Sequence, residues 1–308
     1  MSFITSIGTA NPSNKFDQTQ LADFMVQTMQ LNEADTRKLK TIFRASGIET
    51  RYSVIEDYGK KNDFNFYSNT PTLEPLPGTK ERLEFFKEKS LLVSLKAIAA
   101  CLAKAPTADS EGITHLIVVS CTGMYAPGLD IDIVKSLNLS THVQRLCINF
   151  MGCYAAFNAI KIADSYCASD PKAKVLVVCT ELCSIHFQKE FTDDTLLANA
   201  LFADGSAALL IEGAPSKGVN LKPVSFFCDL ATEGEQDMAW TVGDLGFEMR
   251  LSAYVPEVIK SGIANLTKKL LAQISNQLSD ISYYAIHPGG KKILEVIEEQ
   301  LGLTKQDN

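Results

Sequence analysis

Hydrophobic residues along this chain gather in short, nearly continuous runs that longer amphipathic stretches separate. The clearest runs are ITHLIVVS at 113–120, LCINF at 146–150 and VLVVC at 175–179. Runs of this kind are typical of strands that a parallel sheet buries on both faces. The stretches between them repeat their apolar residues at helical spacing. The pattern therefore predicts an α/β fold, in which strands alternate with helices.

The same pattern gives the expected elements and their order. Strands are expected at 3–7, 113–120, 146–150, 175–179, 219–227 and 281–286, and two apolar runs at 201–204 and 207–211 flank an expected Gly205–Ser206 turn. Helices are expected after Cys153 and at 18–30, 33–46, 80–105, 130–137, 252–278 and 292–300, with loops at 57–78 and 239–249. Because each part contains a strand–loop–helix unit, we expect two similar halves, residues 1–218 and 219–308.

Composition and charge narrow the class of protein. The 308 residues are 46% hydrophobic and 21% charged, which suffices for a sizeable core. The net charge of −7 argues against a general nucleic-acid binder. No apolar run approaches the length of a membrane span, and the N-terminus lacks the pattern of a secretion signal. We expect a cytoplasmic protein with no membrane or nucleic-acid partner.

The eight cysteines are scattered, and none forms a CxxC pair. Cys179 and Cys183 are four positions apart, but no second pair with zinc spacing follows. Reduced thiols and no metal site are the simplest expectation.

Cys153 lies where the strand at 146–150 turns into a helix. Gly152 suits a tight turn, because it has no Cβ to clash. The free N–H groups and the positive dipole end of a helix N-terminus favour a thiolate. This placement predicts a nucleophile. The alternative is a cysteine that packs as a small hydrophobe.

His287 follows the expected strand at 281–286 and precedes Gly289 and Gly290. In open α/β sheets, ligands bind at the carboxyl ends of the strands, which is where His287 is expected. A histidine there can pair with a thiolate or donate a hydrogen bond to a carbonyl oxygen. The alternative is a histidine that only caps the next helix. His186 follows another apolar strand and could face a pocket, whereas His115 and His142 have the context of ordinary surface residues.

Several ordered motifs together resemble one known family. The motifs are IGTANP at 7–12, CTGMYAPGLD at 121–130, MGCYAAFNAI at 151–160, VLVVCTELC at 175–183, ALFADGSAALLI at 200–211 and AIHPGGKKIL at 285–294. Over its whole length the chain resembles the type III polyketide synthases, the chalcone-synthase-like branch of the thiolase superfamily. GDLGFEMRLSAYVP at 243–256 is similar to the bacterial version. The resemblance implies a thiolase-like, duplicated αβαβα layered fold.

The resemblance also implies a mechanism. Cys153 would take an acyl group from coenzyme A, and His287 would keep Cys153 as a thiolate and hold the thioester oxygen of malonyl-CoA. Decarboxylation of malonyl-CoA would give an enolate that attacks the Cys153 thioester, and fixed hydrogen-bond donors would stabilise that enolate. Such an enzyme uses CoA thioesters as substrates, needs no separate cofactor or metal, and forms a homodimer.

The resemblance extends to the pocket and the CoA site. Phe202 matches the gatekeeper phenylalanine, and Met249 or Phe247 falls in the second gatekeeper region. Trp240 replaces a glycine of the plant enzymes and would shrink or reroute the product cavity, and Ala126 replaces a methionine that reaches across the dimer. The other matching cavity positions are Cys121, Cys183, His186 and Ala198. The basic helix offers Lys38, Lys40 and Arg44 for the CoA phosphates, although these residues could equally be a solvated face.

One departure from the family concerns its third catalytic residue, an asparagine. That residue lies in a segment after the AIHPGG helix, and the sequence stops at residue 308, where the segment would begin. We therefore expect that a C-terminal segment is missing. Two alternatives to a polyketide synthase stay open. One is a related condensing enzyme, of the ketoacyl synthase III or hydroxymethylglutaryl-CoA synthase kind. The other is an inactive paralogue that pairs with a complete partner.

Overall fold

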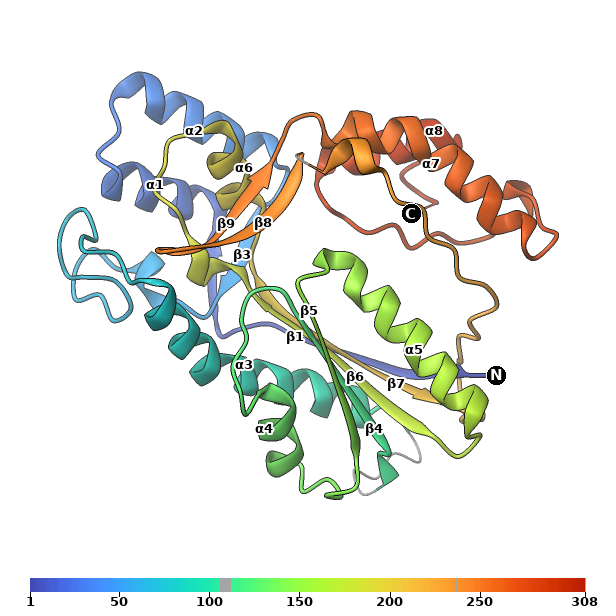
Figure 1. Ribbon diagram of the computed structural model, residues 1–308. Helices are drawn as coiled ribbons and strands as arrows, with labels where there is room; N and C mark the ends of the chain where they lie inside the picture. The colour runs from blue at the N-terminus through green and yellow to red at the C-terminus, as the bar shows by residue number, and fades with distance from the viewer. Residues whose placement is uncertain (106–111, 236, 308) are drawn as a thin grey trace.

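A five-stranded mixed sheet forms the centre of the computed structural model, which describes residues 1–105, 112–235 and 237–307 (Figure 1). Asn308 lies outside the described residues. The strands follow the order β1–β7–β6–β4–β5. β4 is parallel to β5 and β6, whereas β7 is antiparallel to β6 and β1. Their bounds are β1 (Phe3–Ala10), β4 (His115–Ser120), β5 (Gln144–Asn149), β6 (Lys174–Leu182) and β7 (Asp204–Glu212).

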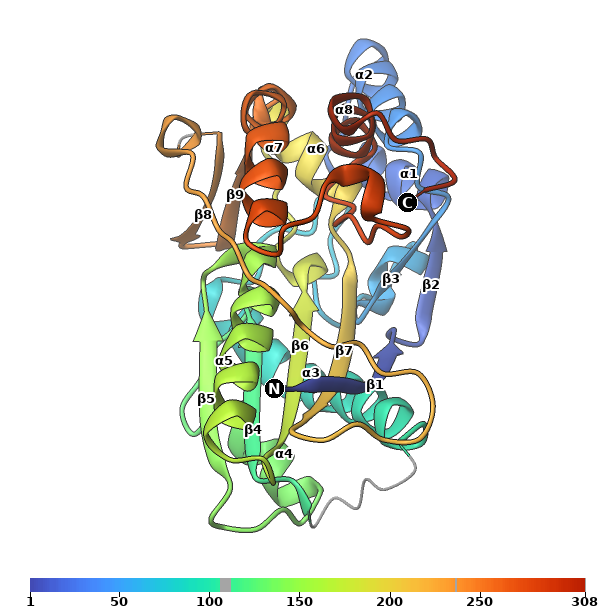
Figure 2. The ribbon, with the colours of Figure 1, turned by 90° about the vertical axis from the view of Figure 1, so that its right-hand side faces the viewer.

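Helices cover both faces of this sheet, which explains its continuous apolar strands. Leu116 and Val118 of β4 belong to the core under α3 (Thr79–Leu102) and α4 (Leu129–Ser136). Ile117 and Val119 alternate with them and belong to the core under α5 (Ala155–Ser169), on the opposite face (Figure 2). Every residue of β4 is buried. The predicted α/β architecture is therefore present in the first part of the chain.

A smaller unit packs at one end of the sheet (Figure 1). It contains an aromatic core around Phe24, Tyr58 and Tyr67. The Asn32 side chain accepts hydrogen bonds from the first amides of its second helix and so fixes where that helix begins. The elements are β2 (Asn14–Asp17), α1 (Gln18–Thr28), α2 (Glu33–Ala45), β3 (Thr50–Ser53) and α6 (Asp193–Leu201).

The remaining elements form a hairpin and two packed helices. The hairpin pairs β8 (Met238–Gly243) with β9 (Gly246–Leu251). α7 (Val255–Ala272) packs against α8 (Lys291–Leu301), and both lie on the side toward which the N-terminal end of α5 points (Figures 1 and 2). No helix in the described ranges is long and apolar enough to cross a membrane.

Four sequence-based predictions about these elements are wrong. Gly205 and Ser206 do not turn, because they pair with Glu181 and Thr180 inside a continuous β7. The expected loop at 239–249 is the β8–β9 hairpin. The expected strand at 219–227 contributes a single bridge, between Leu221 and Ile4.

The fourth wrong prediction is the strand at 281–286. A strand needs a neighbour to satisfy its backbone groups, and none of the three sheets in the described ranges includes this segment. His287 therefore lies in irregular chain before α8 rather than at the end of a strand.

Candidate active site

Cys153 lies in the middle of a single 3₁₀ turn, Gly152–Tyr154, between β5 and α5. Gly152 has a φ of +62°, a conformation that favours glycine. The cysteine itself is exposed, as a nucleophile that meets a substrate must be. The predicted strand–turn–helix placement of Cys153 is therefore present.

The surroundings of the Cys153 sulfur do not favour the thiolate by themselves. Desolvation by neighbouring atoms raises the pKa of the Cys153 thiol, and the charge of Glu181 raises it further. Ionising this thiol at neutral pH therefore calls for a cationic or hydrogen-bonding partner.

Glu181 is a functional candidate that the sequence interpretation missed. Its carboxylate accepts hydrogen bonds from the Cys121 amide at 2.9 Å and from the Thr122 hydroxyl at 2.6 Å. Burial raises the pKa of Glu181 to about 7. The available signal was a lone acidic residue two positions after the apolar run at 175–179, because a charge that is buried at the end of such a strand needs hydrogen-bond partners within the protein.

Cys121 connects the loop after β4 to the turn Gly152–Tyr154, which carries Cys153. Its Sγ accepts a hydrogen bond from the Gly152 amide at 3.1 Å, and its carbonyl oxygen accepts one from Trp240 Nε1 at 2.6 Å. Burial raises the pKa of the Cys121 thiol. Cys121 therefore holds the backbone of the Gly152–Tyr154 turn through its sulfur. It does not line the neighbouring cavity, contrary to the prediction.

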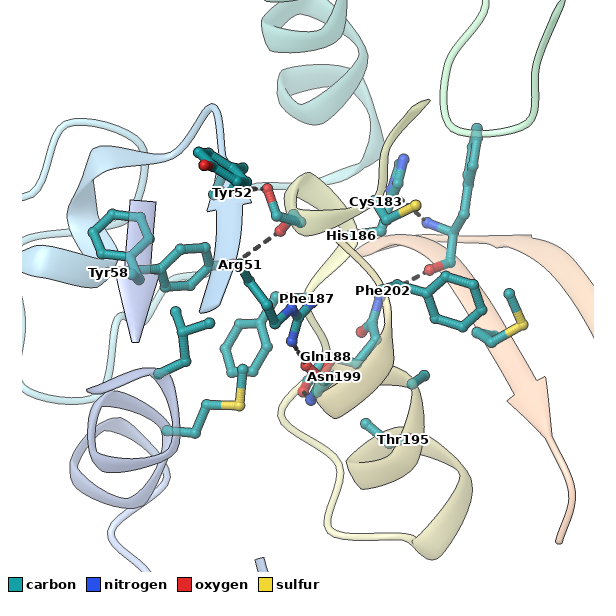
Figure 3. Close-up of a pocket in the computed structure, with 18 of the residues that line it drawn as sticks. Arg51, Tyr52, Tyr58, Cys183, His186, Phe187, Gln188, Thr195, Asn199 and Phe202 are labelled. Atoms are coloured by element: carbon teal, nitrogen blue, oxygen red, sulfur yellow. Dashed lines mark hydrogen bonds between the residues drawn. The ribbon is translucent and has the colours of Figure 1, made fainter. Parts of the chain in front are cut away.

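Most of the predicted pocket residues line one cavity, between α6, the hairpin and the residues after β6 (Figure 3). The volume of this cavity is about 50 Å³. The aromatic side chain of Trp240 belongs to the wall of this cavity. Ala126 is exposed and lies outside the lining. The predicted residues in the lining are Cys183, His186, Ala198, Phe202, Trp240, Phe247 and Met249.

The cavity also has polar residues that the sequence interpretation missed. Arg51 is 8% exposed, and its guanidinium donates to the carbonyl oxygen of Asn199. Burial lowers the pKa of Arg51. An arginine beside a tyrosine in a short strand gives no sequence signal that distinguishes it from a surface residue. Thr195 also contributes to the lining, from α6.

His287 is exposed and lies outside the cavity lining. In the described part of the chain, no hydrogen bond, ring contact or electrostatic interaction joins its imidazole to Cys153. Partial burial lowers the pKa of His287. Its segment packs beside α6, because a Cβ added at Gly290 would lie 3.7 Å from Leu201 Cδ1. The structure thus places Gly290, three residues after His287, beside Leu201 at the end of α6, and it does not place His287 against Cys153.

Two of the three candidate CoA-binding cations already have carboxylate partners. Lys38 Nζ lies 2.5 Å from Asp193, and Lys40 Nζ lies 2.6 Å from Asp23. Both pairs are partly exposed, and such pairs contribute little to stability. Arg44, in the last turn of α2, has no ion pair with any residue that the structure describes. Across the same residues, no group of three or more His, Cys, Asp or Glu side chains is arranged to hold a metal ion.

Comparison with known proteins assigns the chain to a family. The family models for the N-terminal and C-terminal domains of chalcone and stilbene synthases match residues 1–215 and 226–307. The α-pyrone synthesis polyketide synthase-like Pks18 of Mycobacterium tuberculosis is 33% identical over 98% of this chain and 76% of its own length.

Two solved structures agree. The type III polyketide synthase domain of Steely1 from Dictyostelium is 31% identical, with a TM-score of 0.87 over 100% of this chain and 84% of that one. The PKS-I of the brown alga Ectocarpus siliculosus is 29% identical, with a TM-score of 0.89 over 99% of this chain and 82% of that one. These matches do not favour the other condensing enzymes or the inactive-partner alternative. The chain therefore belongs to the chalcone and stilbene synthase family, and it is a condensing acyltransferase of the type III polyketide synthase kind with a thiolase-like fold.

Proposed function

We propose that Cys153 receives the starter acyl group from an acyl-CoA. The Cys153 thiolate attacks the thioester carbonyl carbon, a new C–S bond forms, and the CoA thiolate leaves. The observation that carries this proposal is the exposed sulfur on a tight turn at the start of α5. The family membership of the chain supports it.

Chain extension follows on the same sulfur. Malonyl-CoA loses CO₂, the resulting enolate carbon attacks the Cys153 thioester carbonyl, and the sulfur of Cys153 leaves as a thiolate. We assign His287 to stabilising that thiolate and to donating a hydrogen bond to the malonyl thioester oxygen. The surroundings raise the pKa of Cys153, so a partner of this kind is chemically required. The proposal therefore requires the segment around His287 to approach the N-terminus of α5.

Several finer assignments complete the proposal. Lys38, Lys40 and Arg44 bind the CoA phosphates, exchanging partly exposed ion pairs for charge-assisted phosphate contacts. The reaction needs no cofactor besides CoA thioesters. Because all eight cysteines are free thiols, we place the enzyme in the reducing cytoplasm. The chain consists of two thiolase-like units, an N-terminal one at residues 1–218 that carries Cys153 and an incomplete C-terminal one at residues 219–308 that carries His287.

We also propose a homodimer that forms across the outer edge of β5. β5 is an edge strand of the main sheet, and an edge strand presents unpaired backbone groups. The chain that follows β5 exposes three large apolar side chains, those of Met151, Tyr154 and Phe157. Exposed apolar surface next to an open strand edge favours pairing with a second copy.

Product formation by two cysteine variants tests the nucleophile. C153A is expected to abolish polyketide formation from acyl-CoA and malonyl-CoA, because no sulfur remains to carry the acyl group. C147A is the matched control, since Cys147 is another exposed cysteine, on β5, outside the nucleophile turn. Product analysis by liquid chromatography and mass spectrometry separates the outcomes. An active C153A protein would overturn the proposal.

A further inference from the structure

His186 is a buried histidine whose two ring nitrogens both bind the backbone. It ends the short helix Cys183–His186 and is only 4% exposed. Nε2 lies 2.7 Å from the carbonyl oxygen of Thr122, and Nδ1 lies 2.9 Å from the Phe247 amide nitrogen. A carbonyl oxygen can only accept and an amide can only donate, so these bonds assign a neutral ring with its proton on Nε2.

The imidazole also packs against the aromatic side chains of the hairpin. Its ring lies parallel to the Phe247 ring at 4.3 Å, with 8° between the planes. Trp240 meets His186 edge-on at 5.7 Å. The two hydrogen bonds and the two ring contacts therefore join the loop after β4 to the β8–β9 hairpin through a single side chain.

Other contacts seat the tip of the hairpin in the same position. The Thr79 hydroxyl accepts from the Gly246 amide at 2.9 Å, and the Thr79 amide donates to the Asp244 carbonyl oxygen at 2.9 Å. Gly246 has a φ of +106°, and a Cβ added there would lie 2.9 Å from His186 Nδ1. The positive φ of Gly246 and the absence of a Cβ there thus allow the amide of the next residue, Phe247, to reach the imidazole.

The hairpin held in this way is a wall of the acyl pocket. Trp240, Phe247 and Met249 line the same cavity as Phe202. The loop after β4, which His186 holds through the carbonyl oxygen of Thr122, also carries Cys121. The sulfur of Cys121 accepts a hydrogen bond from the amide of Gly152, next to Cys153. A shift of the hairpin would therefore change the cavity wall and release a contact of the loop behind Cys153.

We propose that His186 is a positioning residue, which locks the hairpin wall onto the loop after β4 and thereby sets which acyl chains the pocket accepts. This inference rests on the proposed function, in which this cavity binds the acyl chain. His186 does not act as a general acid or base, because neither ring nitrogen is free for a substrate. His186 also lines the cavity itself, so its effect on substrates passes through its own ring as well as through Trp240, Phe247 and Met249, and the exchange of the hairpin amides is the readout that isolates the clamp.

Three variants dissect the clamp. H186F keeps a flat ring and removes both hydrogen bonds. H186N places an amide oxygen near the position of Nδ1 and can keep the bond from Phe247. H186Q reaches farther and can keep the bond to Thr122. H115F is the matched control, because His115 is also buried, at 6% exposed, and stacks on Tyr166 at 4.3 Å, but it begins β4 and does not line the cavity.

Two readouts are measured on the purified chain. Hydrogen exchange of the amides in residues 238–251 reports on the hairpin without any need for activity. The ratio of kcat/KM for hexanoyl-CoA and lauroyl-CoA reports on the pocket. We expect H186F to speed exchange of the hairpin amides and to change the selectivity ratio by on the order of 3- to 10-fold, the usual range for one or two lost hydrogen bonds. The change appears mainly in KM.

The control and the partial variants decide the interpretation. H115F should match the parent protein in both readouts, and H186N and H186Q should fall between the parent and H186F. Parent-like exchange and selectivity in H186F would overturn the inference, as would the same changes in H115F. A loss of kcat by on the order of 10²-fold with unchanged hairpin exchange would also overturn it, because that result indicates proton transfer. Failure of Cys153 to accept any acyl group would contradict the proposed function, while the exchange comparison would still test the clamp.

Discussion

At the residue scale, the pKa of the Cys153 thiol depends on its desolvation and on the charge of Glu181. Glu181 is held by the amide and hydroxyl groups of the loop after β4, and its charge opposes ionisation of the Cys153 thiol. Burial raises the pKa of Glu181 to about 7, from 4.5. Protonating Glu181 would therefore remove a negative charge that raises the pKa of Cys153.

The raised pKa of Glu181 predicts a pH dependence of stability. The folded state holds the Glu181 proton more tightly than the unfolded state, so this group's stabilising contribution is complete below pH 4.5 and is lost as pH rises toward 7. E181Q keeps a neutral amide at this site and should reduce that loss, by on the order of 1–3 kcal/mol in the free energy of unfolding. Urea denaturation of both proteins at several pH values measures it. Identical pH profiles would contradict the assignment.

At the element scale, the sequence predicts those helices and strands whose pattern of apolar residues reflects which of their faces are buried. The run at 113–120 is apolar throughout because β4 lies between helices on both faces, with Leu116 facing one layer and Ile117 the other. The turn at Cys153 is predictable because glycine at a positive φ joins a strand to a helix.

Other elements depend on partners that a local pattern does not contain. Ser206 looks like a turn residue, yet it pairs on both sides, with Thr180 and Ala10. The β8–β9 hairpin is not recognised from its own sequence, because the contacts that hold it, with Thr79 and His186, come from distant segments. Of the candidate site, Cys153 and most of the pocket residues could be identified from motifs. Glu181 was missed although it lies within the motif at 175–183, and Arg51 could not be identified, since its importance lies in its burial.

A pair of glycine substitutions tests the role of the nucleophile turn. G152A should destabilise the fold by about 1–2 kcal/mol, because an alanine at φ +62° is strained although no atom lies within 4 Å of the added Cβ. It should also slow acylation of Cys153. G262A is the control, since Gly262 lies within α7 with no atom near an added Cβ, and alanine there should stabilise by about 0.5–1 kcal/mol. Thermal unfolding of both proteins compares them, and equal effects would contradict the strained-turn account.

At the scale of the whole molecule, the proposed homodimer depends on the open edge of the main sheet. F157D places a charge on the exposed face beside that edge, where Phe157 is 52% exposed, and it should shift the protein from dimer to monomer. L92D is the matched control, because Leu92 is 58% exposed but lies on α3, on the other face of the sheet. Sedimentation velocity distinguishes the two species. A monomeric parent protein, or a dimer that F157D leaves intact, would contradict this interface.

The central claim is that Cys153 carries the acyl chain and that malonyl-CoA extends it there. Intact mass of the full chain after incubation with an acyl-CoA, with and without malonyl-CoA, tests this most directly. The account predicts one acyl adduct that C153A abolishes and C147A retains, and that malonyl-CoA discharges as a polyketide. An adduct that forms equally on C153A, or one that persists unchanged when malonyl-CoA is added, would contradict it.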